Sequence, residues 1–407
     1  MRASIQKILG TVTTIILLGG MIFLRAKISA TSFDFQSSNF TFFWLAGRML
    51  TEGENPYDEV QYLAGHETYG IKWQPNKIFP YPLPLAIFCI PLGLLSLPTA
   101  YITWQVITLL IVAWTIFVLL NHWQRSAHSR LLIPIFAAMF FFGPIYLTLH
   151  TGSVGAFALL AIVGAILMLE KDKSLLAGMF LSLTMLKPPQ GVTILLLAVI
   201  WFLVRQDWKV IYGIAFGGIA LLVIGMIQDP LWLVKFRGAS EVVMDRTQGV
   251  HSNVWAFAYL ACRGSSPCWL IFGGASSLIL LGLGGFFLWR NQTRLSTWEA
   301  FNVILPLAFV STIYLWAYDQ LPYIIPIVWI IGTLVERKKS YLHAFIFLVV
   351  VEIASFFALV QQAATSKDLW SLGTTVLVLG MALWLHHCQT SSVNQGAPPD
   401  PRNIHLF

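Results

Sequence analysis

The sequence predicts an all-α membrane protein that crosses the bilayer many times. Of its 407 residues, 57% are hydrophobic and only 11% are charged, and the mean hydropathy is +0.73. Apolar stretches close to the length that a helix needs to cross the hydrocarbon core recur along the whole chain. These observations are typical of a polytopic membrane protein.

Twelve apolar stretches predict membrane-spanning helices. They lie at residues 8–24, 98–120, 131–149, 153–169, 174–186, 190–204, 210–227, 268–289, 299–316, 321–335, 341–363 and 369–386. The first follows Arg2 and Lys7, a pattern that a cleaved signal peptide would also show. Because residues 24–30 make a weak cleavage site and many spans follow, we expect a retained helix.

A further apolar stretch, 83–97, is ambiguous, and the basic residues of short loops decide its placement. It has 15 residues and is interrupted by Pro84 and Pro91, which favours a re-entrant or interfacial helix over a span. With that placement, five short loops with eleven basic residues all face the cytoplasm, as the positive-inside rule requires. These residues are Arg125, Arg130, Lys171, Lys173, Arg205, Lys209, Arg290, Arg294, Arg337, Lys338 and Lys339. We therefore expect twelve spans with both termini inside.

This topology defines the expected domain organisation. One transmembrane domain covers residues 1–390, with a long external first loop at 25–97 that carries juxtamembrane helices, and a second external loop at 228–267. The proline-containing end, 391–407, is expected to be a disordered cytoplasmic tail. The net charge of +7 fits cytoplasmic basic loops, so nucleic acid is not an expected partner.

Polar residues from distant parts of the chain share the outer side under this topology. They are Asp34, His150, Lys187 and Asp319, together with the 228–267 loop. In a chain with so few polar residues, this convergence predicts a site that faces outward. The stretch 31–81 is the first long polar segment and contains six of the 18 acidic residues. Asp34 lies about ten residues past the first span, at the membrane surface, where partial desolvation can raise the pKa of a carboxylate toward that of a useful base.

Three blocks of sequence resemble glycosyltransferase family 87, a family of membrane enzymes of the GT-C class. The first block is Asp34-Phe35, Phe43-Trp44-Leu45-Ala46-Gly47-Arg48, Gly53-Glu54-Asn55-Pro56-Tyr57-Asp58 and Phe79-Pro80-Tyr81-Pro82-Leu83. The second is Leu176-Ala177-Gly178 with Thr184-Met185-Leu186-Lys187-Pro188-Pro189, and the third, looser block is Ala317-Tyr318-Asp319-Gln320. The sequence departs from the family pattern at Gly152-Ser153, where glycine-glutamine is frequent, and at Tyr318-Asp319, where histidine is frequent.

The resemblance implies an enzyme of the plasma membrane with its active site on the external face. It implies transfer of a sugar, with mannose favoured, from a polyprenyl-phosphate donor to a hydroxyl of a glycolipid or glycan acceptor, with inversion at the anomeric carbon. Asp34 matches the position of the general base. Asp34-Phe35-Gln36 is not a DxD motif, and nothing predicts a metal or another cofactor.

The remaining polar residues are candidates for substrate contacts, each beside a simpler structural role. Lys187, Arg246 and His251 are candidates for the donor phosphate; Lys187 could instead be a snorkelling lysine, and we expect loss of its charge to lower turnover without affecting stability. Asp319 is expected either to hold an acceptor hydroxyl or to pair with a cation. His150, Asn253 and Tyr81 are further acceptor or sugar candidates, although boundary histidines, polar loop residues and belt aromatics are common without a site role.

Other functions and a possible disulfide stay open at this point. A transporter or flippase of lipid-linked glycans would be expected to have charges within its spans or paired broken helices, and the sequence shows almost no such charges and no internal repeat. A non-catalytic membrane subunit would not need the outward convergence of polar residues. Cys262 and Cys268 flank Arg263–Pro267 in the second external loop, where they could be bridged or free.

Overall fold

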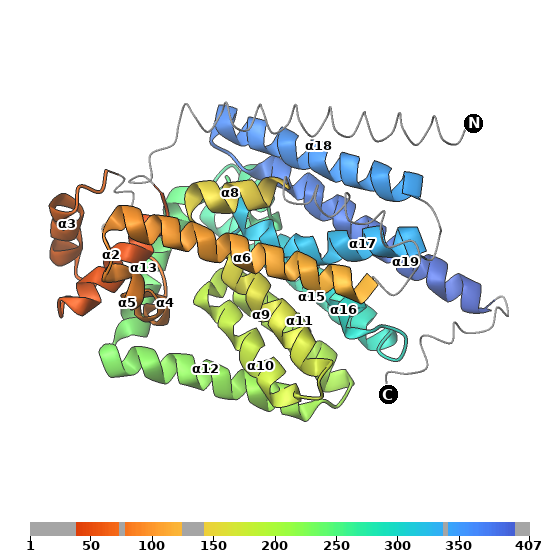
Figure 1. Ribbon diagram of the computed structural model, residues 1–407. Coiled ribbons are helices and arrows are strands. Elements are labelled where there is room, and N and C mark those ends of the chain that lie inside the picture. Colours follow the sequence, from red (N-terminus) through yellow and green to blue (C-terminus); the bar gives the residue numbers. More distant parts are fainter. Residues whose placement is uncertain (1–37, 73–77, 124–141, 337–340, 395–407) are drawn as a thin grey trace, which may run out of the picture.

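The computed structural model is a bundle of helices, and it describes residues 38–72, 78–123, 142–336 and 341–394 (Figure 1). The first half contains α2 (Phe40–Thr51), α3 (Glu59–Thr68), α4 (Leu83–Phe88), α5 (Ile90–Gly93), α6 (Leu97–Trp123), α8 (Gly143–Thr151), α9 (Gly155–Leu169), α10 (Ser174–Ser182), η4 (Leu183–Leu186), α11 (Pro188–Val204) and α12 (Trp208–Gln228). The second half contains α13 (Trp232–Thr247), α14 (Val254–Ala261), α15 (Ser266–Arg290), α16 (Thr297–Ser311), η5 (Ala317–Tyr323), α17 (Ile324–Glu336), α18 (Tyr341–Thr365), η6 (Leu369–Ser371) and α19 (Leu372–Asn394).

Six helical stretches within the described ranges are long and apolar enough to cross a membrane. They are Leu97–Leu119, Trp208–Gln228, Ser266–Arg290, Ala317–Val335, Tyr341–Thr365 and Leu369–Cys388. Four shorter apolar helices, Gly155–Leu169, Ser174–Leu186, Pro188–Val204 and Thr297–Ser311, pack among them. The predicted multi-pass helical membrane protein is thus confirmed, while the count of twelve spans stays a prediction. The expected span 8–24 and most of 131–149 lie outside the described residues.

Two predicted boundaries change in the structure, and the ambiguous stretch 83–97 takes the short-helix form that its length and prolines favoured. The apolar stretch 83–97 forms two short helices, α4 and α5, neither long enough to cross a bilayer. The helix in the expected span 299–316 ends at Ser311, because the backbone at Thr312 is extended. The Ser311 carbonyl accepts hydrogen bonds from the side chains of Trp255 in α14 and Ser277 in α15. Helix α19 continues to Asn394, so the expected tail begins later than 391; residues 395–407 lie outside the described ranges.

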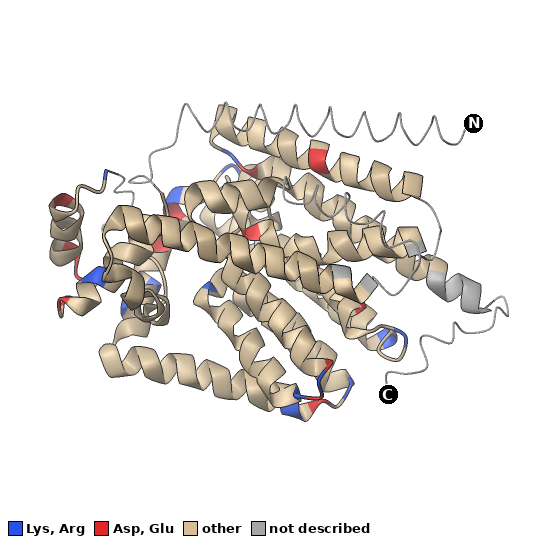
Figure 2. Ribbon diagram, viewed as in Figure 1, with Lys and Arg blue, Asp and Glu red and all other residues tan. Residues whose placement is uncertain are grey.

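Charged residues mark the two ends of the bundle. They cluster around α2, α3 and α13 and at the loops of the opposite end, while the helices between are almost uncharged (Figure 2). At that opposite end, three of the basic loops predicted to share a face lie together. Arg205 donates to the carbonyls of Gln292 and Leu295 at 3.0 and 3.3 Å, and Trp298 donates to Glu170 at 2.8 Å. The loops after α9, α11 and α15 therefore lie on one side, as the positive-inside count requires.

Close packing of small residues joins α10 to α12. A Cβ added at Gly178 would lie 2.0 Å from the Val210 carbonyl oxygen, and one at Gly213 would lie 2.1 Å from that of Leu175. Only glycine permits this approach, which is the usual way in which apolar helices associate in lipid. The packing gives a structural reason for the Leu176-Ala177-Gly178 motif. Because η4 directly continues α10, the packing also helps to position Lys187, the residue that follows η4.

The segment 228–267 is more ordered than a polar loop. It contains the 16-residue helix α13 and the short helix α14. Cys262 and Cys268 are bridged by a disulfide across the turn between α14 and α15, which settles the alternative that the sequence left open. A disulfide is typical of an oxidising compartment, which agrees with the side expected for this loop.

A labelling experiment tests the predicted sidedness. Val60 in α3 is 78% exposed, and Lys171, in the loop between α9 and α10, is also exposed. If 83–97 does not span, Val60→Cys and Lys171→Cys face opposite sides of the membrane. We expect a membrane-impermeant maleimide to label Val60→Cys on intact cells and Lys171→Cys only after permeabilisation, both in a Cys388→Ser background. Equal labelling of the two variants on intact cells would contradict this topology.

Candidate functional site

A cavity of about 190 Å³ lies at the end of the bundle that carries α2 and α13. Five separate segments of the chain line it: residues 39–42, 80–82, 187–189, 236–247 and 314–318. Its volume is below the roughly 300–1,000 Å³ of sites that enclose drug-sized ligands. It therefore suits a group the size of one sugar or one phosphate, with the rest of a larger substrate lying outside.

A buried ion pair forms the inner wall. Lys187 stands between η4 and α11, and its Nζ donates to Oδ1 of Asp319 in η5. The side chains are 6% and 0% exposed. The sequence left two roles open for Asp319, and the structure shows a contact of one kind, a pair with the cationic Lys187. The Asp319 carboxylate also accepts from the backbone N–H of Trp316 at 3.1 Å, so it fixes the first turn of η5 as well as the lysine.

Three aromatic residues stand beside the ion pair. Tyr314 and Trp316 lie on the non-helical stretch after α16, and Tyr318 lies in the first turn of η5; all three line the cavity. Lys187 Nζ lies 4.8 Å from the ring centre of Tyr318 and 5.8 Å from that of Tyr314. The electron-rich ring faces add attraction for the ammonium group. The lysine is thus held in one place by a carboxylate and two aromatic rings.

The C-terminal helices hold η5 in position. The backbone N–H of Ala317 donates to Oδ2 of buried Asp368, whose Oδ1 accepts from Ser371 at 2.5 Å. On the other side, Thr148 Oγ1 donates to the Tyr318 carbonyl at 3.0 Å. A Cβ at Gly155 would lie 2.9 Å from that carbonyl, so α9 can approach only through glycine. Residues far beyond and far before Asp319 therefore define its position.

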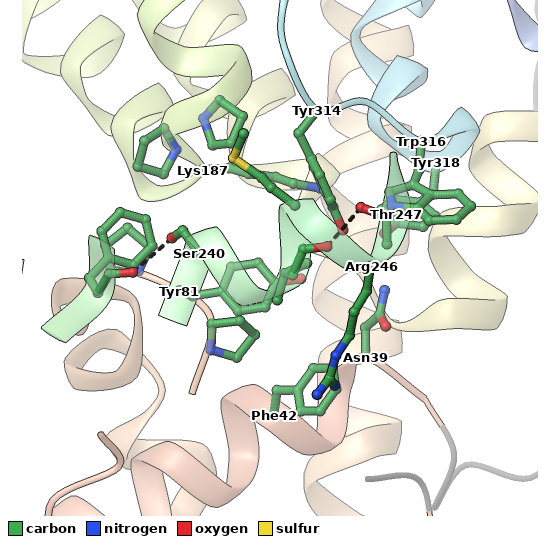
Figure 3. Close-up of a pocket in the computed structure, with 17 residues that line it drawn as sticks. Asn39, Phe42, Tyr81, Lys187, Ser240, Arg246, Thr247, Tyr314, Trp316 and Tyr318 are labelled. Carbon is green, nitrogen blue, oxygen red and sulfur yellow. Dashed lines mark hydrogen bonds between the residues drawn. The ribbon is translucent and has the colours of Figure 1, made fainter. Parts of the chain in front are cut away.

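Helix α13 forms the outer wall. Phe236, Ser240, Val243 and Thr247 line the cavity at the spacing of one helix face. Arg246 also lines it, and its side chain extends from α13 toward Phe42 and Asn39 (Figure 3). Two cationic residues predicted for the donor phosphate, Lys187 and Arg246, thus line one cavity although they come from different segments of the chain.

The first polar segment supplies the remaining walls. Tyr81 lines the cavity and packs edge-on against Phe43 of α2, with ring centres 4.8 Å apart. Asn39, at the start of α2, lines it too, and its backbone N–H donates to the Thr151 carbonyl at 2.7 Å. Asp34, the predicted base, lies outside the described residues; it precedes Asn39 by five positions in the sequence.

His251 does not line the cavity: it packs behind the aromatic wall that Tyr314, Trp316 and Tyr318 form. It is 4% exposed, its ring centre is 4.4 Å from that of Tyr314, and its Nε2 is 3.0 Å from Thr247 Oγ1. Burial lowers the pKa of His251 to about 3, and the positive charge of Lys187 also lowers that pKa. The imidazole is therefore neutral at physiological pH, where it cannot offer a positive charge to a phosphate.

Two other predicted residues also lie off the cavity. Asn253 is fully buried and caps α14, accepting from the Ala256 N–H at 2.9 Å. His150 ends α8 and stacks on Tyr146, with ring centres 5.8 Å apart. Neither lines the cavity. The contact of Asn253 is that of a helix cap, one of the simpler roles that the sequence left open.

Sequence reasoning missed the aromatic wall and most of α13. The alternation of Tyr314, Trp316 and Tyr318 with small or aliphatic residues is a period-two pattern, which could have separated this stretch from the preceding helix. The spacing of Trp232, Phe236, Val243 and Thr247 likewise indicates an amphipathic helix within the segment taken as a loop.

Comparison with known protein families identifies the same family that the three blocks of sequence resemble. The description of the matching family is glycosyltransferase family 87, and the match covers residues 79–313, more than half of the chain. It includes three of the cavity-lining segments and ends just before Tyr314. No curated protein and no solved structure matches the chain.

The buried His251 generates a pH prediction. An unfolded histidine has a pKa near 6.5, whereas folded His251 takes up a proton only near pH 3. Its contribution to stability is therefore full above about pH 6.5 and declines as the pH falls toward 3, by about 2 kcal/mol at pH 5. We expect His251→Gln, which keeps a polar group near Thr247, to flatten the decrease of Tm between pH 7 and pH 5. Equal slopes for the variant and the wild type would show that His251 is not held neutral.

Proposed function

The chain belongs to glycosyltransferase family 87, and from this membership and the cavity we propose how it transfers a sugar. Family membership implies a membrane glycosyltransferase, and the six long apolar helices agree with that. The proposed donor is a polyprenyl-phosphate-linked sugar, with mannose preferred, and the proposed acceptor is a hydroxyl of a glycolipid or glycan. The proposed site faces the exterior of the plasma membrane.

One observation carries this proposal: Lys187, at the start of α11, and Arg246, in α13, line the same small cavity. Transfer from a lipid phosphate releases an anion, so the transition state carries growing negative charge on the departing phosphate. Fixed cations at that position stabilise the transition state more than the ground state. Arg246 can bind phosphate oxygens with two N–H groups, whereas Lys187 acts as a point charge.

The Lys187–Asp319 pair refines this role. Lys187 is already neutralised by a buried carboxylate, so the pair as a whole adds no net charge to the cavity. When a phosphate approaches, the ammonium can donate a second hydrogen bond to it while keeping its bond to Asp319, since it has three N–H donors. Asp319 would then orient the lysine rather than bind an acceptor, and Arg246 would contribute further N–H donors to the phosphate oxygens.

The aromatic residues suit the sugar. Tyr81, Tyr314, Trp316 and Tyr318 surround a cavity large enough for a single sugar. Their ring faces can pack on its C–H groups, while the phosphate lies toward Arg246 and Lys187. His150 and Asn253 do not line the cavity, so in this proposal the acceptor contacts come from the cavity walls instead.

The remaining step is activation of the acceptor, for which Asp34 is the proposed base. Inverting transfer needs a carboxylate within about 2.6–3.2 Å of the attacking hydroxyl. The acceptor oxygen forms the new bond to the anomeric carbon, the bond to the phosphate oxygen breaks, and the hydroxyl proton passes to Asp34. In the sequence Asp34 lies five positions before Asn39, which lines the cavity.

A transfer assay tests the proposed function against the transporter alternative. Purified protein is incubated with radiolabelled polyprenyl-phosphate mannose and a membrane glycolipid extract. We expect release of polyprenyl phosphate together with label in the glycolipid fraction. Movement of the intact donor across a vesicle membrane without release of polyprenyl phosphate would support the flippase instead.

The base assignment predicts a selective loss. Asp34→Asn keeps the size of the side chain but cannot accept the proton, so turnover should fall about 10²–10⁴-fold. The matched control is Asp58→Asn: Asp58 caps α3 by accepting from Gln61 N–H at 2.9 Å, and asparagine caps equally well. Its turnover should stay near that of the wild type. Similar activity of Asp34→Asn and Asp58→Asn would refute the assignment.

The ion pair predicts that stability and turnover can be separated. Contrary to the expectation from sequence, Lys187→Met should lower stability, because it leaves the buried Asp319 carboxylate without its partner, at a cost of about 3–5 kcal/mol. The double variant Lys187→Met/Asp319→Asn removes both charges and should recover most of the lost Tm. If Lys187 assists phosphate departure, the double variant still turns over at least tenfold more slowly than the wild type. Full activity of this stable double variant would show that Lys187 is only structural.

A further inference from the structure

We propose that Asp229 is a positioning residue: it fixes the outer wall of the cavity, α13, to the loop that carries Asn55. The motif Gly53–Asp58 has no role in the chemistry described above, and neither does the junction between α12 and α13. The structure brings them together although 174 residues separate Asn55 from Asp229. The contact gives both segments a function that neither shows alone.

Asp229 receives three hydrogen bonds at the start of the α13 segment. Its Oδ2 accepts from Lys235 Nζ at 2.6 Å and from Asn55 Nδ2 at 3.1 Å, and its Oδ1 accepts from the Leu231 N–H at 3.0 Å. The side chain is only 12% exposed. Burial alone would raise the pKa of Asp229, but the bonds from Lys235, Leu231 and Asn55 outweigh it and hold that pKa below its usual value. The carboxylate is therefore charged and fully engaged.

Asn55 extends this contact to the wall on the other side of the cavity. Its Oδ1 accepts from the Tyr57 N–H at 2.9 Å, and the Tyr57 hydroxyl donates to the Tyr81 carbonyl at 2.6 Å. Tyr81 lines the cavity. A continuous series of hydrogen bonds thus runs from α13 through Asp229, Asn55 and Tyr57 to Tyr81. The width of the cavity between α13 and Tyr81 depends on it.

Helix α13 needs such an attachment because it buries little surface. Only Trp232 and Ala239 of its 16 residues are buried, and Val234 and Arg237 are 71% and 82% exposed. Elements with few buried contacts open at low free-energy cost. If the attachment is lost, each substrate must order α13 when it binds, so KM should rise more than kcat falls. This effect on kinetics rests on the proposed function, whereas the ordering of α13 does not.

Hydrogen–deuterium exchange of the full-length protein in detergent tests the attachment directly. We expect Asp229→Asn and Lys235→Met to speed exchange of the amides of α13 about tenfold, the effect of losing one charge-assisted hydrogen bond. Lys235→Arg keeps the ion pair and should restore slow exchange. The matched control is Arg237→Gln, which removes the exposed pair with Glu241 at 2.9 Å on the same helix and should leave exchange unchanged.

Kinetic measurements on the same variants separate positioning from folding. KM for the donor should rise about fivefold in Asp229→Asn and Lys235→Met, with kcat within about twofold of the wild type and little change for Arg237→Gln. Unchanged α13 exchange in both Asp229→Asn and Lys235→Met would overturn the proposal. If exchange responds as expected but no variant, nor the wild type, transfers sugar, the attachment holds and the proposed function fails.

Discussion

The ion pair between Lys187 and Asp319 is the contact on which the rest of the site depends. It joins the segment between η4 and α11 to η5 across 132 residues of sequence, and both side chains are almost completely buried. A buried charge without its partner costs several kcal/mol, so any arrangement that separates these two residues is disfavoured. The same contact sets the position of the aromatic wall, because Asp319 also binds the backbone N–H of Trp316.

Around this pair, the packing of apolar helices brings the polar residues of the cavity together. Glycines at 155 and 178 allow α9 and α10 to approach their neighbours closely, and this packing brings η5 and η4 together. The backbone of η5 is fixed by a hydrogen bond that Ala317 N–H donates to Asp368 and by one that Thr148 donates to the Tyr318 carbonyl. The polar groups in this part of the protein are costly to bury in a membrane unless they are paired. The cavity is thus bordered by charged and polar groups that are paired with one another.

Much of the fold could be predicted from the sequence, since hydropathy reports directly on burial in lipid. The helices from α9 to α12 match their expected ranges within a few residues, and the basic loops after α9, α11 and α15 lie together as the charge count required. Lys187 was expected at the end of the span 174–186, and it lies there, between η4 and α11.

The partners of the site residues could not be predicted in the same way. Hydropathy carries no information on which residue faces which, so Asp319 could be assigned to an acceptor or to a cation with equal reason. His251 and Asn253 share a polar loop composition with Arg246, yet only Arg246 lines the cavity. The difference arises from the turn after α13, which directs His251 behind Tyr314. Helix α13 itself was overlooked because its hydrophobic residues are spaced for one face and give no continuous apolar run.

An experimental map of the protein with bound polyprenyl phosphate would test the account most directly. Cryo-electron microscopy of the protein in lipid nanodiscs, with and without this product, would locate the phosphate group. The account predicts phosphate density between Arg246 and Lys187, with Lys187 still within hydrogen-bond distance of Asp319. Phosphate density elsewhere on the protein, with the cavity between α13 and Tyr81 empty, would contradict it.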